Sequence, residues 1–204
     1  MSTQINRLIN VQRSESSPTE PVTLAEAKAQ CIVTYSDDDT LITSLITKAR
    51  KSIENYCNIS IVAQTVVMTA DLYKEWELPY GPVTGIQSVQ SRTSTQGSGP
   101  AVYSGLATGW GTDGTDFMTF IPGGANDFNP SIPFTGNFGY PPYGSRYKIQ
   151  YTTGYTLGNP CPDDLKQAVL AQILFLYEKR GEQGDGICDQ ARVLADPYKR
   201  QLWL

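Results

Sequence analysis

The chain has 204 residues, of which 40% are hydrophobic and only 18% are charged, and its formal net charge is -4 without a single histidine. A chain of this length can bury roughly 70% of the surface that it exposes when unfolded, so it can fold without disulfides or a structural metal. The shortage of cations argues against tight phosphate binding, and the missing histidine excludes Ser-His-Asp and Cys-His catalytic arrangements.

The first twenty residues form a polar segment. Residues 1–20 end in SESSPTEP and hold few apolar side chains, which predicts a flexible N-terminal arm that a partner could order. They lack the apolar core of a signal peptide, and no window elsewhere approaches eighteen apolar residues. We therefore expect a protein that is made and folded in a cytoplasm and that has no membrane partner.

Four cysteines are spread along the chain without any CxxC pair, namely Cys31, Cys57, Cys161 and Cys188. Without histidine, a zinc site would have to be built from thiolates and carboxylates alone. We expect reduced, mostly buried thiols and no metal site.

Two helix starts follow the arm in quick succession. The sequence TLAE at Thr23–Glu26 is a capping box, which predicts a short helix that runs to about Gln30. Ser36 then precedes three aspartates, so it is the expected N-cap of a second helix. Arg50 and two lysines lie in the C-terminal half of that helix, where the helix dipole favours cations. Apolar residues recur at helical spacing and give this helix one apolar stripe: Leu41, Ile42, Leu45, Ile46, Ala49, Ile53 and Tyr56.

The period then changes from helix to strand. Runs of β-branched and aromatic residues, separated by Gly and Pro clusters, predict strands at residues 61–72, 83–91, 100–104, 116–121 and 146–155. From Thr93 through Ser145 there is no lysine or arginine. A surface there would suit protein or sugar contacts rather than phosphates, although a loop insertion without a binding role remains the alternative.

The most strongly patterned helix comes late, in PCPDDLKQAVLAQILFLYEKRG at Pro160–Gly181. Pro162 suits the first helical position, two aspartates follow it, and Gly181 ends the helix. Apolar groups lie on a broad face and also, at Leu170, Leu174 and Phe175, off that face, so burial on more than one side is expected. One partner would be the helix at residues 41–56, and a second could be a neighbouring subunit.

The last segment predicts a short helical piece at about Cys188–Ala195 and then a tail, residues 196–204, that ends in three large apolar residues. Such residues rarely remain in water at a free end, so the tail is expected to dock on this chain or on another.

A search for chemistry finds little. The sequence contains neither GxSxG nor a phosphate-binding GxxxxGK[ST] loop. The acidic pair Asp113 and Asp116 lacks the remaining ligands of a calcium loop, and Asp163 with Asp164 is explained by a helix start. Tyr140 and Tyr143 could stack on a sugar or a proline-rich partner, or simply pack a loop. We predict no enzyme activity, no cofactor and no catalytic residue.

These patterns predict an α+β protein, in which a small α-helical bundle is formed by the N- and C-terminal segments and a β-rich, Gly/Pro-rich region is inserted between them. The expected parts are a flexible arm over 1–20, a helical core over 21–60 and 160–195, an inserted β-rich region over 61–159, and a docking tail over 196–204.

Several segments occur in a specific order: PVTLAEAKAQCIV, DDDTLITSLITKARKSIENYCN, ELPYGPVTGIQSV, YKIQYTTGY, PDDLKQAVLAQILFLYEKRG and ARVLADPYKR. In this order they resemble the head-to-tail connector proteins, also called head-completion or adaptor proteins, of long-tailed double-stranded DNA bacteriophages. The resemblance covers about residues 21–92 and 146–200, and it leaves out the Gly-rich part from about Thr93 to Ser145.

The resemblance implies a structural protein of the virion neck that forms a ring of roughly twelve subunits below the portal. The ring would bind the portal protein and a stopper or tail-terminator protein, and double-stranded DNA would pass through its lumen without specific binding. Tail residues are the expected portal contacts, namely Pro197, Tyr198, Lys199, Arg200, Leu202, Trp203 and Leu204. Leu170, Leu174 and Phe175 are the expected contacts between subunits.

Two other classes stay open at this point. In the first, the Tyr- and Gly-rich β region would be a carbohydrate- or receptor-binding module of the virion. The capped and patterned helices on both sides of that region favour the connector over such a module, because sugar-binding modules are usually all-β. The second class, an enzyme of DNA packaging or lysis, is disfavoured by the missing histidine and phosphate loop, although magnesium held by carboxylates alone would still permit a nuclease.

Overall fold

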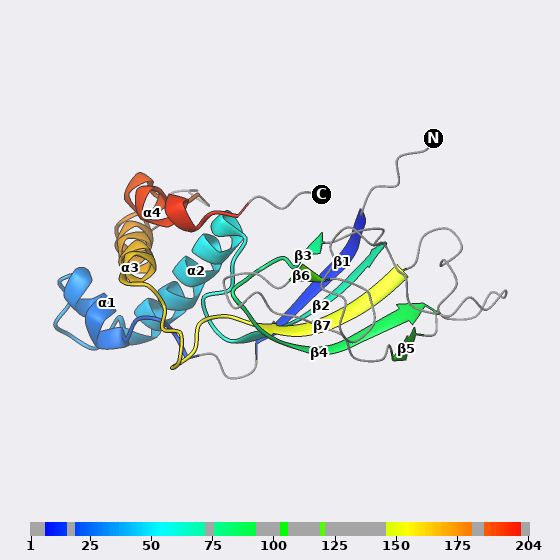
Figure 1. Ribbon diagram of the computed structural model, residues 1–204. Coiled ribbons are helices and arrows are strands. Elements are labelled where there is room, and N and C mark those ends of the chain that lie inside the picture. Colours follow the sequence, from blue (N-terminus) through cyan, green and yellow to red (C-terminus); the bar gives the residue numbers. More distant parts are fainter. Residues whose placement is uncertain are drawn as a thin grey trace. The chain divides into compact units, whose positions relative to one another are not determined.

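The computed structural model describes residues 7–15, 19–71, 76–92, 103–105, 119–120, 146–180 and 186–200. The chain divides into two compact units, which are described separately below (Figure 1). A helical unit comprises Ser17–Ala63 and Gly154–Leu202, and a sheet unit comprises Met1–Ser16, Gln64–Thr153 and Trp203–Leu204. Helices and an antiparallel sheet in one chain confirm the predicted α+β class.

The helical unit contains α1 (Leu24–Gln30), α2 (Asp39–Cys57), α3 (Asp163–Glu178), α4 (Asp189–Ala195) and the short 3₁₀ helix η1 (Asp196–Tyr198). The capping box before α1 is confirmed. The backbone N–H of Glu26 donates to Oγ1 of Thr23 over 3.2 Å, and the N–H of Thr23 donates to Oε2 of Glu26 over 2.7 Å. Each residue thus satisfies a backbone donor that the first turn leaves open.

The prediction that Ser36 caps α2 is wrong. The helix begins at Asp39, and the N-cap residue is Asp38, whose side chain makes no capping hydrogen bond. The Asp38 carboxylate instead accepts hydrogen bonds from the far end of α3, as described below. The Asp38 side chain therefore binds residues at the end of α3 instead of the backbone N–H groups of its own helix.

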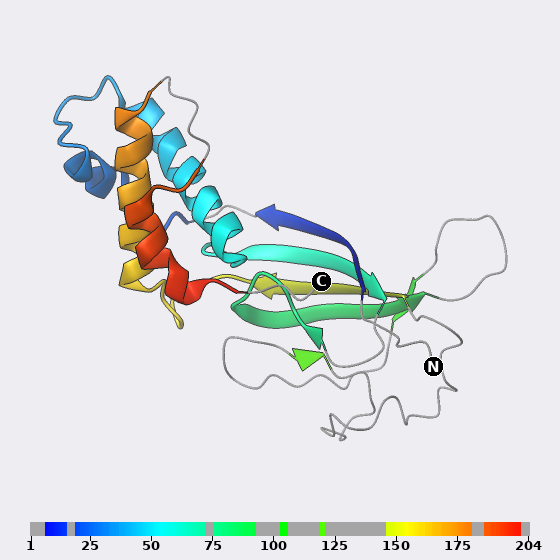
Figure 2. The ribbon, with the colours of Figure 1, turned by 90° about the horizontal axis from the view of Figure 1, so that it is seen from above.

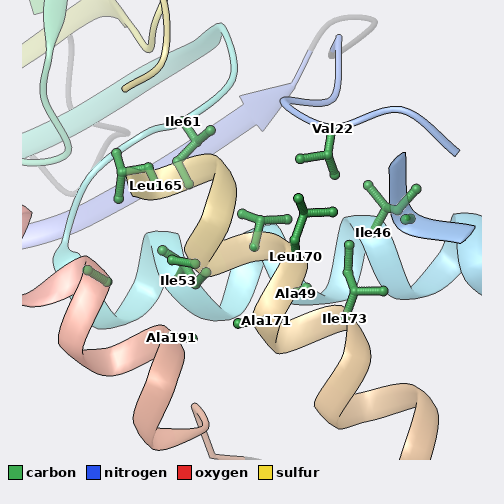
Figure 3. Packing of buried hydrophobic residues seen from close by; sticks show 14 of the residues in the cluster. Val22, Ile46, Ala49, Ile53, Ile61, Leu165, Leu170, Ala171, Ile173 and Ala191 are labelled. Carbon is green, nitrogen blue, oxygen red and sulfur yellow. The ribbon is translucent and has the colours of Figure 1, made fainter. Parts of the chain in front are cut away.

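One continuous core holds the helical unit together. It is formed by buried side chains from all four helices, including Ile46, Ile53, Leu165 and Ala191 (Figure 3). The expected packing of α3 against α2 is confirmed, and α3 also packs against α1 and α4. Much of the apolar surface of α3, including Leu170, therefore finds partners within this chain.

The sheet unit contains a five-stranded antiparallel sheet with the strand order β1-β2-β7-β4-β5 (Figure 2). Its strands are β1 (Arg7–Glu15), β2 (Gln64–Asp71), β4 (Val83–Arg92), β5 (Tyr103–Gly105) and β7 (Arg146–Thr153). Two further short strands, β3 (Trp76–Glu77) and β6 (Thr119–Phe120), pair with each other. Of the predicted Gly-rich stretch, 93–145, only β5 and β6 fall within the described residues.

The prediction of a flexible arm over residues 1–20 is wrong for residues 7–15. These residues form β1, which pairs with β2 from Arg7 opposite Asp71 to Glu15 opposite Gln64. The segment has few apolar groups, but Leu8 and Val11 pack against the buried cluster of the sheet. A partner strand that is distant in sequence satisfies the backbone hydrogen bonds, and no local pattern announces it.

Side-chain alternation gives the sheet one apolar face. Val66, Met68 and Ala70 of β2 are buried beside Ile149 and Tyr151 of β7. On the opposite face, the Gln150 amide donates to Oε1 of Gln87 over 2.6 Å, and the Thr84 hydroxyl donates to Oγ1 of Thr152 over 2.9 Å. The period of two that predicted these strands therefore separates a buried face from a polar one.

The chain leaves the helical unit after Ala63 and returns at Gly154, and the two segments lie together there. The N–H of Tyr155 donates to the carbonyl of Ile61 over 3.2 Å. Gly154 has φ of +106°, and a Cβ atom at this position would lie 2.2 Å from the carbonyl oxygen of Val62. Glycine is required here for both its backbone angle and its lack of a side chain.

Candidate functional site

Among the described residues, no three His, Cys, Asp or Glu side chains are grouped so that they could hold a metal ion. The four cysteines carry free thiols, of which Cys57 is buried and the other three are half-buried, so the expectation of mostly buried thiols is wrong. Burial raises the pKa of Cys57 and of Cys161 to about 11, which keeps both as neutral thiols at neutral pH. In the described ranges, no helix is both long and apolar enough to cross a membrane.

The strongest electrostatic feature is a buried network around Arg50 of α2, whose side chain is fully buried. Nε of Arg50 donates to Oε2 of Glu20 over 2.8 Å, and one terminal nitrogen donates to Oε2 of Glu54 over 3.0 Å. Oε1 of Glu54 accepts from the N–H of Ile61 over 2.7 Å and from that of Val62 over 3.3 Å. The network thus connects the segment before α1, the helix α2, and the segment that leads to β2.

The sequence patterns accounted for Arg50 only by its position in the C-terminal half of the helix and did not indicate this network. A signal was present, because Arg50 lies four residues after Ile46 and four before Glu54, on the buried side of the helix. A charged residue within an apolar stripe, with an opposite charge four positions away, indicates a buried ion pair rather than a solvated one.

A second cluster, centred on Asp38, connects the start of α2 with the end of α3. Oδ2 of Asp38 accepts from the Tyr177 hydroxyl over 2.6 Å, from Arg180 over 3.0 Å and from the Tyr35 hydroxyl over 3.3 Å. The guanidinium of Arg180 also stacks on the Tyr177 ring, 3.9 Å from its centroid. The hydrogen bonds from Tyr177 and then from Arg180 lower the pKa of Asp38, and the contact with Asp38 raises the pKa of Tyr177.

The predicted docking tail is held on its own helical unit over residues 196–200. The hydroxyl of Tyr56 donates to Asp196, which raises the pKa of Tyr56. The N–H of Arg200 donates to the carbonyl of Cys57 over 2.9 Å, and the Asn58 amide donates to the carbonyl of Arg200 over 3.0 Å. These residues form a fixed segment along the C-terminal end of α2.

The side chains of this segment differ in what they leave exposed. The Tyr198 hydroxyl donates to Asp164 of α3 over 3.3 Å, and Nζ of Lys199 lies 4.2 Å from the centroid of the Tyr56 ring. Pro197 and Lys199 remain exposed, whereas Tyr198 and Arg200 are half-buried. The other predicted tail contacts, Leu202, Trp203 and Leu204, lie outside the described residues, as do Tyr140 and Tyr143.

The three α3 residues predicted to contact a neighbouring subunit are not equivalent. Leu170 is only 9% exposed and belongs to the core of its own helical unit (Figure 3), so its predicted role between subunits is corrected. Leu174 and Phe175 are half-buried and keep some surface. Nζ of Lys179 lies 5.9 Å from the centroid of the Phe175 ring.

Comparison with protein families agrees with the resemblance noted from the sequence. Residues 21–90 match the family described as phage gp6-like head-tail connector protein. This range contains α1, α2, the strands β2 and β3 and most of β4, and it includes Arg50 and Glu54 of the buried network but not Glu20. No curated protein matches the chain.

Solved structures share the fold over nearly the whole chain. The neck of an empty gene transfer agent particle, computed with C6 symmetry, contains a chain that matches with a TM-score of 0.68 at 17% identity, covering 96% of this chain and 98% of that one. A chain from the virion of a native gene transfer agent particle matches with the same values. The neck of the native particle, computed with C12 symmetry, matches with a TM-score of 0.54 at 17% identity, covering 93% and 98%.

Proposed function

We propose, from the match to the phage head-tail connector family, that this chain is a structural subunit of the neck of a phage-like particle. Copies would form a ring below the portal, extend the DNA channel, and join the head to a stopper or tail-terminator protein. The observation that carries the proposal is the shared fold with a neck chain over 96% of this chain, which takes in both the helical and the sheet unit. The role requires neither catalysis nor a cofactor, and assembly would take place in the cytoplasm of a bacterial host.

A closed ring of about twelve subunits is supported by the symmetry of the similar structures, which are necks computed with C6 and C12 symmetry. A cyclic ring uses heterologous contacts, in which one face of a subunit packs on a different face of the next. Leu174 and Phe175, which α3 leaves half-buried, are proposed to contribute to such a contact.

The proposed lumen would let double-stranded DNA slide through without binding it specifically. Each phosphate that a protein neutralises releases counterions, so clustered cations would hold the DNA in place. The chain has 16 Lys and Arg against 20 Asp and Glu. One of these cations, Arg50, is buried and so cannot contact DNA. This charge balance favours passage over retention.

Portal binding is proposed for the C-terminal segment, Pro197–Leu204. Residues 197–200 would act as a fixed base rather than a free arm, because Arg200 and Tyr198 are held by α2 and α3. A base that is already ordered loses little conformational entropy when it binds. Pro197, Lys199 and the terminal Leu202, Trp203 and Leu204 would then provide the contacts with the portal protein.

The first test is the mass of the purified chain, measured by native mass spectrometry alone and with the portal protein of the same particle. An assembly of about twelve copies in either condition is expected. A chain that stays monomeric in both conditions, and that is missing from the necks of purified particles, would refute the proposal.

The tail is tested by removing residues 201–204. This deletion keeps the contacts of Arg200 with Cys57 and Asn58, so the helical unit should fold as before. We expect the shortened chain to bind the portal at least tenfold more weakly, because aromatic and apolar anchors dominate such interfaces. Unchanged portal binding would leave the ring proposal standing but would remove the tail from it.

A further inference from the structure

Ile32 occupies an unusual position at the end of α1. Its N–H donates to the carbonyl of Ala29 over 3.2 Å, and the N–H of Val33 donates to the carbonyl of Lys28 over 2.9 Å. This pair of bonds is the usual close of a helix, in which glycine normally occupies the left-handed position. Here that position holds a β-branched residue with φ of +56°, whose side chain is 89% exposed.

Ile32 destabilises the unassembled chain in two ways. Its backbone is held in the left-handed region, and its apolar side chain is exposed to water. Single exposed apolar residues are common on protein surfaces, but a strained one at a glycine position is not. Burial of Ile32 against a partner would offset the second cost. The position therefore suggests a contact that is made only after assembly.

The surroundings of Ile32 are apolar and acidic. We call Ile32, Thr34, Tyr35 and Asp37 the loop patch, and all four residues are exposed. Asp37 makes no ion pair with any residue that the structure describes. The cations nearby are already paired, Arg180 with Asp38 over 3.0 Å and Lys28 with Asp39 over 2.6 Å.

An exposed apolar residue and a cation lie side by side on α4. We call Arg192 and Val193 the helix patch, and both residues are exposed. Val193 is 71% exposed, and Arg192 pairs with Asp189 only at 3.6 Å. The helix patch thus offers one exposed apolar residue and one loosely paired cation, which complement Ile32 and Asp37 of the loop patch.

The two patches lie on different sides of the helical unit. In Figure 1 α3 lies between α1 and α4, and α1 and α4 each pack against α3. A heterologous ring needs this arrangement, since each subunit must offer one patch to the copy before it and the other to the copy after it.

We propose that the loop patch of one copy packs against the helix patch of the next copy, with Ile32 beside Val193 and Asp37 beside Arg192. The occupant of the loop patch is therefore a second copy of this chain. The inference rests on the proposed ring function and names the surfaces that would close the ring. The opposite charges of Asp37 and Arg192 would also fix the direction in which subunits join.

Charge exchange tests this contact directly. Asp37→Lys and Arg192→Glu each place like charges across the proposed contact, so each should weaken assembly on the order of tenfold per contact. The double variant restores an opposite pair and should recover assembly. The readout is the fraction of ring-sized particles by mass photometry, alone or with the portal protein, whichever condition assembles the unmodified chain.

Ile32→Gly is a second test, because it should raise the stability of the free subunit and lower ring assembly. Glycine relieves the left-handed backbone, so the free subunit should become more resistant to heat, while ring formation should fall. Leu157→Ser is the control, because Leu157 is fully exposed in the helical unit but belongs to neither patch.

Different results would refute the proposed ring function and the proposed contact between the patches. If the unmodified chain forms no ring and is missing from necks, the proposed function fails. If it forms rings but the single charge variants assemble normally, or the double variant does not recover, the patches are not the contact. Normal assembly of Ile32→Gly together with higher thermal stability would likewise overturn the inference.

Discussion

Arg50 holds three segments of the helical unit together. Its guanidinium is fully buried and contacts the carboxylates of Glu20 and Glu54. Glu54 in turn binds the backbone of Ile61 and Val62. A buried ion pair adds little net stability compared with an apolar pair, but the loss of one partner leaves the other charge buried without compensation.

Arg50→Ala should therefore lower the free energy of unfolding by about 3–5 kcal/mol. Lys51→Ala, at the exposed neighbouring position, is the matched control and should change it by less than about 0.5 kcal/mol. Urea denaturation followed by circular dichroism measures both. Equal effects of the two substitutions would contradict the role assigned to the buried network.

The Asp38 cluster predicts a dependence of stability on pH. Hydrogen bonds from Tyr177 and Arg180 lower the pKa of Asp38 from its ordinary value of 3.8. Because the folded state holds the ionised form more strongly, this contribution is complete above the unfolded-state pKa and is lost as the pH falls through the folded-state pKa.

Asp38→Asn should thus destabilise the chain at neutral pH, and its urea midpoint should approach that of the unmodified chain as the pH falls below about 4. Asp37→Asn, at the exposed position next to it, should leave the midpoint of the free, unassembled subunit unchanged. A gap between Asp38→Asn and the unmodified chain that is the same at every pH would show that the ionised carboxylate is not what stabilises the cluster.

At the scale of elements, α3 separates a core face from a partly exposed one. Leu170 is buried among the helices of its own chain, whereas Leu174 and Phe175 retain surface. The helix has contacts with α1, α2 and α4, so much of its apolar surface is used within the chain. Its half-buried apolar residues are the ones that we propose to contact a neighbour.

Leu170→Ala should cost about 2–5 kcal/mol of stability by leaving a cavity. Phe175→Ser should leave the folded subunit intact and reduce the fraction of ring-sized particles, as measured by native mass spectrometry. A Phe175→Ser subunit that assembles as well as the unmodified chain would restrict the contact between subunits to other residues.

The sequence predicted the elements whose pattern is local. The capping box at Thr23 placed α1, and the β-branched runs placed β2, β4, β5, β6 and β7. β1 could not be predicted, because its apolar content is low and its pairing partner lies about fifty residues away. β3 has two residues, too few for any period to appear.

The candidate site was less predictable for a similar reason. The docking role of the tail stays a prediction, and the attachment of residues 196–200 to Tyr56, Cys57 and Asn58 involves residues about 140 positions earlier. The strain at Ile32 is also hidden in the sequence, since an isoleucine after a short helix gives no sign of a left-handed backbone. Both features emerge only when distant segments fold together.

At the scale of the whole molecule, the helical unit is built from two stretches of chain whose ends adjoin. The hydrogen bond between Tyr155 and Ile61 holds the point of exit beside the point of return. Because the two ends of the intervening segment lie close together, replacing that segment with a short turn costs little conformational entropy. The helical unit should therefore not depend on the sheet for its fold.

We expect a chain that lacks residues 1–16, and in which a short Gly-Ser turn replaces residues 64–153, to fold into a helical protein. Circular dichroism should show a helical spectrum and a cooperative thermal transition. The same shortened chain with Arg50→Ala is the control and should melt at a lower temperature. A spectrum of unfolded chain for the shortened protein itself would show that the helices require the sheet.

The close approach of Gly154 to Val62 has a consequence for how such proteins diversify. Because the two ends of the sheet segment meet at one point, a single insertion or deletion in a gene can enlarge, replace or remove that segment without moving any helix. The junction at Ala63 and Gly154 would act as a graft point. Related chains could then vary the sheet segment while they inherit an unchanged helical unit.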